Sequence, residues 1–92
     1  MANRRTKLEI IYDILSSVQD KRGKIKPTHL LYKSNLSHKK MVLYVQELMQ
    51  KGMLGEEMAE KEGKRMYVLT DAGAKFLAEF KRMRQFTESF GF

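Results

Sequence analysis

The side chains best suited to chemistry in this sequence are basic and polar groups in its first half. Residues 1–51 carry 11 basic and 4 acidic side chains, whereas residues 52–92 carry 7 of each, so the net charge of +7 arises entirely before residue 52. Lysine and arginine donate hydrogen bonds to phosphate oxygens and to base edges. This asymmetry favours an anionic partner, although a solvated surface that keeps a small protein soluble would also be basic.

The densest group of donors lies in residues 37–51, where apolar spacing predicts a helix. The side chains expected to face outward or to flank that face are Ser37, His38, Lys39, Lys40, Val42 and Gln46. Val42 suits a thymine methyl, and the lysines suit phosphate or guanine. Because this face has no arginine and one amide, we expect weak or broad sequence preference. An ordinary solvated helix face would also carry Lys39 and Lys40.

Five further residues extend this candidate DNA-contacting set. Lys64 and Arg65 lie at the tip of an expected hairpin. Because glutamates lie nearby, only this tip could contact DNA phosphates. A turn exposed to solvent would have the same composition. Arg5 belongs to a basic arm that either follows DNA or is a frayed terminus. Lys26 and Thr28 stand at the start of an expected short helix.

Several classes of protein are excluded or disfavoured. The chain has no cysteine, and its two histidines, His29 and His38, have no metal-site spacing. We therefore expect no metal, no cofactor, no small-molecule substrate and no enzymatic activity. No apolar run approaches the roughly 20 residues of a membrane span, and the polar N-terminus is not a secretory signal. These features predict a cytoplasmic protein, associated with the nucleoid if its partner is DNA, with no membrane partner.

Apolar spacing and cap residues predict helices over residues 4–20, 27–33, 37–51 and 70–90. The first has an apolar stripe of Leu8, Ile11, Ile14, Leu15 and Val18. Pro27, Ser37 and Thr70 are residue types favoured at the starts of the other three. Asn35 suits the turn between the second and third helices.

Between these helices, residues 24–26 alternate like a very short strand, and residues 53–69 predict a two-stranded hairpin. The resulting order of elements is that of a winged helix-turn-helix: a mainly α fold with a small β-hairpin (α+β) in a single domain over residues 1–92. In such a fold the third helix fits the major groove, and the hairpin is the wing.

The last predicted helix has more apolar side chains than a small domain can cover. Leaving them in water would create an exposed apolar patch. Pairing with a second copy would cover them in a homodimer interface of Leu77, Phe80, Met83, Arg84, Phe86, Thr87 and Phe90. The alternative is that this helix folds back on its own domain, against the first helix.

Several runs of sequence together carry a family resemblance: residues 30–37, Tyr44, Leu48, residues 51–54, and residues 67–73 with Phe76 and Leu77. Over about residues 5–85 the chain resembles archaeal winged-helix proteins of the small chromosomal 10a type and the related archaeal transcription regulators. The resemblance implies non-enzymatic DNA binding through the third helix and wing, and a homodimer formed by antiparallel last helices. By position, the DNA contacts would be Ser37, His38, Lys39, Val42, Lys64 and Arg65.

The last helix departs from that pattern, because Arg82, Arg84 and Gln85 interrupt its heptad regularity. This departure bears on the dimer geometry more than on DNA binding. The leading hypothesis is a dimeric protein that binds double-stranded DNA, as a transcription regulator or a chromatin protein. The alternative is a winged-helix adaptor that binds other proteins without direct DNA contact.

Overall fold

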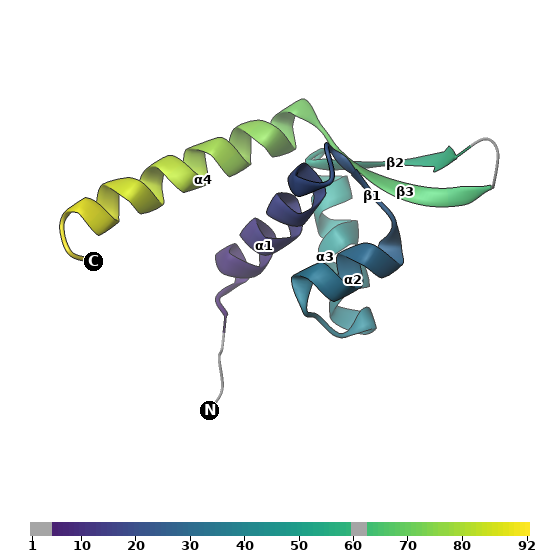
Figure 1. Cartoon of the computed structure of the whole chain (residues 1–92), viewed down its shortest axis with the longest axis horizontal. Helices are drawn as coiled ribbons and strands as arrows, with labels where there is room; N and C mark the ends of the chain where they lie inside the picture. Colours follow the sequence, from purple (N-terminus) through teal and green to yellow (C-terminus); the bar gives the residue numbers. More distant parts are fainter. Residues whose placement is uncertain (1–4, 60–62) are drawn as a thin grey trace.

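The computed structural model describes residues 5–59 and 63–92, which contain four helices and a small antiparallel sheet. The hairpin of this sheet projects to one side of the helices (Figure 1). Residue 4, the expected start of the first helix, and residues 60–62 of the expected hairpin lie outside the described residues. In chain order the elements are α1 (Lys7–Asp20), β1 (Lys24–Ile25), α2 (Pro27–Ser34), α3 (His38–Gln50), β2 (Leu54–Ala59), β3 (Lys64–Leu69) and α4 (Asp71–Ser89). The mainly helical α+β winged-helix fold is confirmed.

Helix α1 starts at Lys7 because the residues before it form a capping box. The Thr6 hydroxyl accepts a hydrogen bond from the Glu9 amide at 3.1 Å, and the Glu9 carboxylate accepts one from the Thr6 amide at 2.7 Å. These bonds also lower the pKa of Glu9. The helix ends before Gly23, whose φ of 90° is a left-handed value that suits glycine.

The turn between α2 and α3 is short and is built from residues with special backbone roles. Asn35 ends α2 in the left-handed conformation, with φ 55°. Ser37 is the N-cap of α3, and its hydroxyl accepts a hydrogen bond from the Lys40 amide at 3.2 Å. The two helices therefore form the helix-turn-helix that the sequence predicts.

The sheet contains one pairing that the sequence does not reveal. Strand β1 joins the hairpin, giving the order β1-β3-β2, with Ile25 opposite Tyr67 and Leu54 opposite Leu69. The Leu69 amide also donates to the Gly23 carbonyl at 2.8 Å. Strand β3 is thus held on both sides, and β1 anchors the start of α2 beside the wing.

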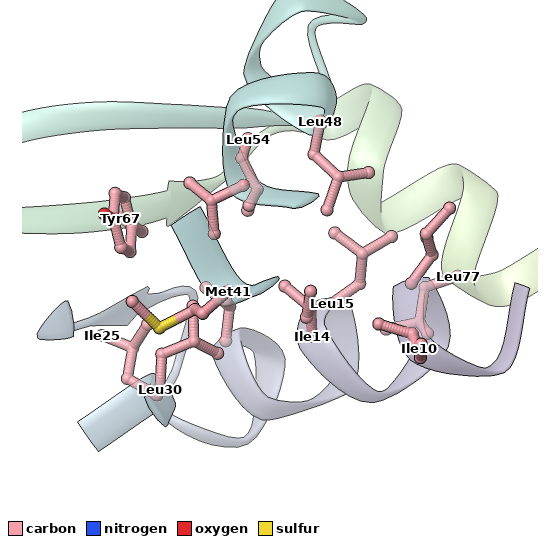
Figure 2. Close-up of a cluster of buried hydrophobic side chains, with 13 residues drawn as sticks. Ile10, Ile14, Leu15, Ile25, Leu30, Met41, Leu48, Leu54, Tyr67 and Leu77 are labelled. Carbon is pink, nitrogen blue, oxygen red and sulfur yellow. The ribbon is translucent and has the colours of Figure 1, made fainter. Parts of the chain in front are cut away.

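The hydrophobic core lies where α1, α2 and α3 meet the sheet and the start of α4 (Figure 2). Leu8 was expected on the apolar stripe of α1, but it is 48% exposed. The buried apolar side chains are Ile10, Ile11, Ile14, Leu15, Val18, Ile25, Leu30, Met41, Val45, Leu48, Leu54, Tyr67 and Leu77.

The start of α4 is fastened to the turn that follows α3. The Thr70 hydroxyl donates to the Gly52 carbonyl at 2.6 Å and accepts from the Gly73 amide at 3.0 Å. Gly73 is buried, and a Cβ there would collide with the Met53 carbonyl oxygen. This contact sets the direction in which α4 leaves the domain, on the side opposite the hairpin (Figure 1).

Candidate nucleic-acid interface

The outer face of α3 presents a row of hydrogen-bond donors. Met41, Val45 and Leu48 are buried in the core, and this burial fixes which side of the helix faces outward. The exposed residues on or beside the outer face include five of those that the sequence points to: Ser37, His38, Lys39, Lys40 and Gln46. Their lysine, imidazole and amide groups can bond to phosphates and base edges.

The structure corrects one residue of this face and adds another. Val42 was expected to point outward, but it is half-buried and packs against the core. Leu43 is instead the apolar side chain on the outer face, with 57% of its surface exposed. Helical spacing could have identified it, because position 43 lies opposite the buried positions 41, 45 and 48.

A second group of expected residues comes together beside the wing. Lys26, Thr28, Lys64 and Arg65 line one shallow depression, together with Pro27. The β1–β3 pairing brings the start of α2 to the wing, although these residues are far apart in sequence. Within the described chain, no side chain caps the first amides of α2, so this depression combines basic groups with helix N–H donors.

Glutamates on β2 moderate the charge of the wing. The Arg65 Nε lies 2.5 Å from Glu56 Oε2, and Lys24 Nζ lies 2.8 Å from Glu57 Oε1. Interactions with the Tyr67 hydroxyl and the Glu56 carboxylate raise the pKa of Arg65, so this guanidinium stays charged. Part of the wing charge is therefore neutralised within the protein, and phosphate binding at Arg65 would compete with Glu56.

Arg5 has a different role from the one that its place in a basic arm suggests. Its guanidinium donates to Asp13 Oδ2 at 2.7 Å, to the Ser34 carbonyl at 2.8 Å and to the Asn35 carbonyl at 3.0 Å. These bonds satisfy carbonyls at the end of α2 and join the turn to α1. Arg5 thus supports the helix-turn-helix from inside, a role that sequence spacing could not reveal because its partners at positions 34 and 35 are remote.

A second ion pair holds α3 against α1. Lys7 Nζ lies 2.8 Å from Glu47 Oε2. Their hydrogen bond raises the pKa of Lys7 and lowers that of Glu47, so each group favours the charged state of the other. Both groups are solvent-exposed, so the pair contributes more to the orientation of α3 than to stability.

The residues expected in a dimer interface divide into two groups. Leu77 is fully buried in the core of the protomer, and it is therefore not available to a second copy. Phe80 is half-buried against Tyr12 of α1, with ring centroids 5.3 Å apart, and the Arg84 guanidinium lies 5.1 Å from the centroid of the same Tyr12 ring. This part of α4 folds back on α1, which was the alternative arrangement.

The remaining expected interface residues are exposed on the protomer. Met83, Phe86 and Phe90 are 51%, 64% and 65% exposed, and Thr87 is exposed beside them. The Phe86 and Phe90 rings contact each other edge to face, with centroids 5.0 Å apart. The C-terminal half of α4 thus carries an apolar patch, which we define as Met83, Phe86 and Phe90.

The described residues show no arrangement suited to metal chemistry or to a membrane span. Among residues 5–59 and 63–92, no group of histidine and carboxylate side chains could hold a metal ion. His29 and His38 are both exposed. No helix in this part of the chain is both long enough and apolar enough to span a bilayer.

Comparison with known proteins identifies the fold. The DNA-binding protein Sso10a-2 from Sulfolobus solfataricus has a TM-score of 0.73 at 22% identity, with 95% of this chain and 90% of that chain covered. A winged-helix DNA-binding protein from STIV has a TM-score of 0.76 at 17% identity, with 89% and 92% covered. These values confirm the resemblance to archaeal winged-helix proteins at the level of fold.

A longer protein shares the same fold. A MarR family transcriptional regulator from Silicibacter pomeroyi has a TM-score of 0.77 at 22% identity, and the match covers 90% of this chain but only 56% of the regulator. Among curated proteins, no sequence matches this chain. The family model described as winged helix-turn-helix matches residues 4–88, and the chain belongs to this winged helix-turn-helix family.

Proposed function

We propose that this protein binds double-stranded DNA without catalysing a reaction, as a transcription regulator or a chromatin-associated protein. The observation that carries the proposal is the exposed face of α3, where Lys39, Lys40 and Gln46 stand clear of the core. A helix of 13 residues is about 20 Å long, and the major groove admits one α-helix. We place α3 in that groove.

The wing side of the protein would supply contacts to the DNA backbone. The depression lined by Lys26, Thr28, Lys64 and Arg65 gathers basic and hydroxyl groups that suit a phosphate. Support for DNA as the partner also comes from the folds of Sso10a-2 and the STIV protein, both of which are described as DNA-binding. Within the hairpin, the glutamates on β2 limit these backbone contacts to the end that carries Lys64 and Arg65.

We further propose that two copies pair through the apolar patch on α4. Its three large side chains are more than half exposed. The C-terminal part of α4 extends away from the other helices (Figure 1). An isologous contact between two such helices would bury the patch and place two α3 helices on one duplex.

A salt titration of affinity tests the DNA proposal. Each phosphate that is neutralised contributes about 0.9 to the slope of log affinity against log salt. The double variant Lys39→Gln/Lys40→Gln should therefore bind a random duplex more weakly and lower the slope by about 1.8. Lys75→Gln/Lys81→Gln on α4 removes the same charge away from α3 and is the matched control. Equal losses in the two variants, or no binding of any duplex at low salt, would favour the adaptor hypothesis.

Sedimentation equilibrium tests the dimer separately. Phe86→Asp/Phe90→Asp should convert a dimer into a monomer, because it places charges within the patch. Gln85→Asp, on an exposed polar side of the same helix, should leave the dimer intact. A wild-type protein that sediments as a monomer at all concentrations would refute this part of the proposal.

A further inference from the structure

Leu43 occupies an unusual position on α3. Lys39, Leu43, Gln46 and Gln50 follow one another at intervals of four, three and four residues, and all are exposed. They form a row along the outer face, opposite the buried residues of the helix. Leu43 is therefore an apolar side chain flanked on its own row by an ammonium group and two amides.

The fold itself does not require a leucine here, because 57% of Leu43 is exposed. A single exposed leucine would need no explanation on most surfaces. This one is distinguished by its own row, in which the other side chains are polar. The two shallow depressions that it borders are lined by polar side chains such as Lys40 and Glu47 together with the aromatic Tyr44. The patch on α4 is different, because its apolar side chains lie together and suit a second apolar surface.

An apolar group beside an amide matches one feature of the major groove. The 5-methyl group of thymine is the apolar group that the four bases display there, and glutamine can bond to both N6 and N7 of adenine. Leu43 and Gln46 are three residues apart, so their Cβ atoms are neighbours on the helix surface, about 5–6 Å apart. The two side chains can therefore reach the same base pair or adjacent base pairs.

We propose that Leu43 and Gln46 give this protein a preference for A·T pairs, with Leu43 packed on a thymine 5-methyl group and Gln46 bonded to adenine. This inference rests on the proposed DNA binding and on the placement of α3 in the major groove. In this proposal Leu43, and not Val42, contacts thymine. The sequence preference then depends on two residues, Leu43 and Gln46.

The first test changes the DNA and leaves the protein unaltered: replacing thymine with uracil removes the 5-methyl group that Leu43 would contact. Fluorescence anisotropy compares two alternating duplexes of about 24 base pairs, one built from adenine and thymine and the other from adenine and uracil. The wild-type protein should bind the thymine duplex about fourfold more tightly for each methyl group that Leu43 contacts. The minor groove is the same in both duplexes, so the ratio reports contacts in the major groove.

Variants of the protein test whether Leu43 causes the difference in affinity between the thymine and uracil duplexes. Leu43→Ala should bind both duplexes with equal affinity, whereas Leu43→Met keeps an apolar side chain and should retain the ratio. Gln46→Ala should keep the thymine-to-uracil ratio, and its preference for the A·T duplex over an alternating G·C duplex should fall to the part that Leu43 supplies through thymine. Lys39→Gln should weaken binding to all duplexes by the same factor.

The outcomes separate the two proposals. Salt-dependent binding with equal affinity for thymine and uracil duplexes would overturn the role of Leu43 and leave DNA binding in place. A ratio that persists in Leu43→Ala would also overturn it. Absence of binding to every duplex at low salt would overturn the proposed function, and the inference would fall with it.

Discussion

The two halves of α4 contain similar residues in opposite environments. In the first half, Leu77 is buried in the core and Phe80 is half-buried against α1, whereas in the second half Phe86 and Phe90 are exposed. The helix has 19 residues and is about 28 Å long, and its C-terminal part extends away from the other helices (Figure 1). Position along the helix therefore decides whether an aromatic or aliphatic side chain stabilises the protomer or remains available to a partner.

The largest expected effect is in the first half. Leu77→Ala should lower the free energy of unfolding by about 2–5 kcal/mol, because it leaves a cavity in the core where α4 packs on α1. Urea denaturation measures this change. The loss should be the same at all protein concentrations, since Leu77 lies inside the protomer. A loss below about 1 kcal/mol would mean that the first half of α4 is not part of the core.

A smaller effect is expected where α4 begins. Gly73→Ala should cost about 1–3 kcal/mol, because the new methyl group collides with the Met53 carbonyl and forces α4 to shift. Gly55→Ala is the matched control, since a Cβ there meets only the Thr70 methyl group at 3.9 Å. Thermal unfolding should give a clearly lower Tm for Gly73→Ala than for Gly55→Ala. Equal stability would show that α4 is not fixed by this contact.

The boundary between the two halves lies at Arg84, which rests on Tyr12. Arg84→Ala should lower stability by about 0.5–1 kcal/mol, the usual size of an exposed cation–π contact. Arg82→Ala removes the same charge from a neighbouring exposed position and should have less effect. If both variants unfold alike, the boundary lies earlier, at Phe80.

The smallest expected effect on the protomer is in the second half. Phe86→Ala should leave the unfolding of dilute protein unchanged, because its ring packs on Phe90 and not on the core. At high concentration the wild-type protein should become more stable through dimerisation, and the variant should gain less. Scanning calorimetry at two concentrations checks both statements. If dilute Phe86→Ala were less stable than the dilute wild-type protein, the second half of α4 would also contribute to the stability of the protomer.

Local signals made the elements predictable. Ser37, Thr70 and Pro27 begin helices as their residue types predict, and Asn35 adopts the left-handed turn. The pairing of β1 with β3 could not be predicted, because a two-residue strand has too little alternation to identify its partner.

The functional surface was less predictable, because it depends on contacts between distant segments. The exposed lysines of α3 follow from helical spacing, and stricter use of the same spacing would have exchanged Val42 for Leu43. The inward role of Arg5 depends on carbonyls about thirty residues away. The burial of Leu77 depends on which part of α4 packs against the rest of the domain. The sequence alone does not specify where that contact ends.

The Thr70 hydroxyl links the turn after α3 to the start of α4 through two hydrogen bonds, one donated and one accepted. It gives its proton to the Gly52 carbonyl and uses a lone pair to hold the Gly73 amide. An ionised aspartate is as good an N-cap in an isolated helix, but it cannot give a proton to Gly52. This position therefore favours a side chain that both donates and accepts hydrogen bonds, as a hydroxyl does through one atom. One side chain thereby fixes the first turn of α4 against the turn that follows α3.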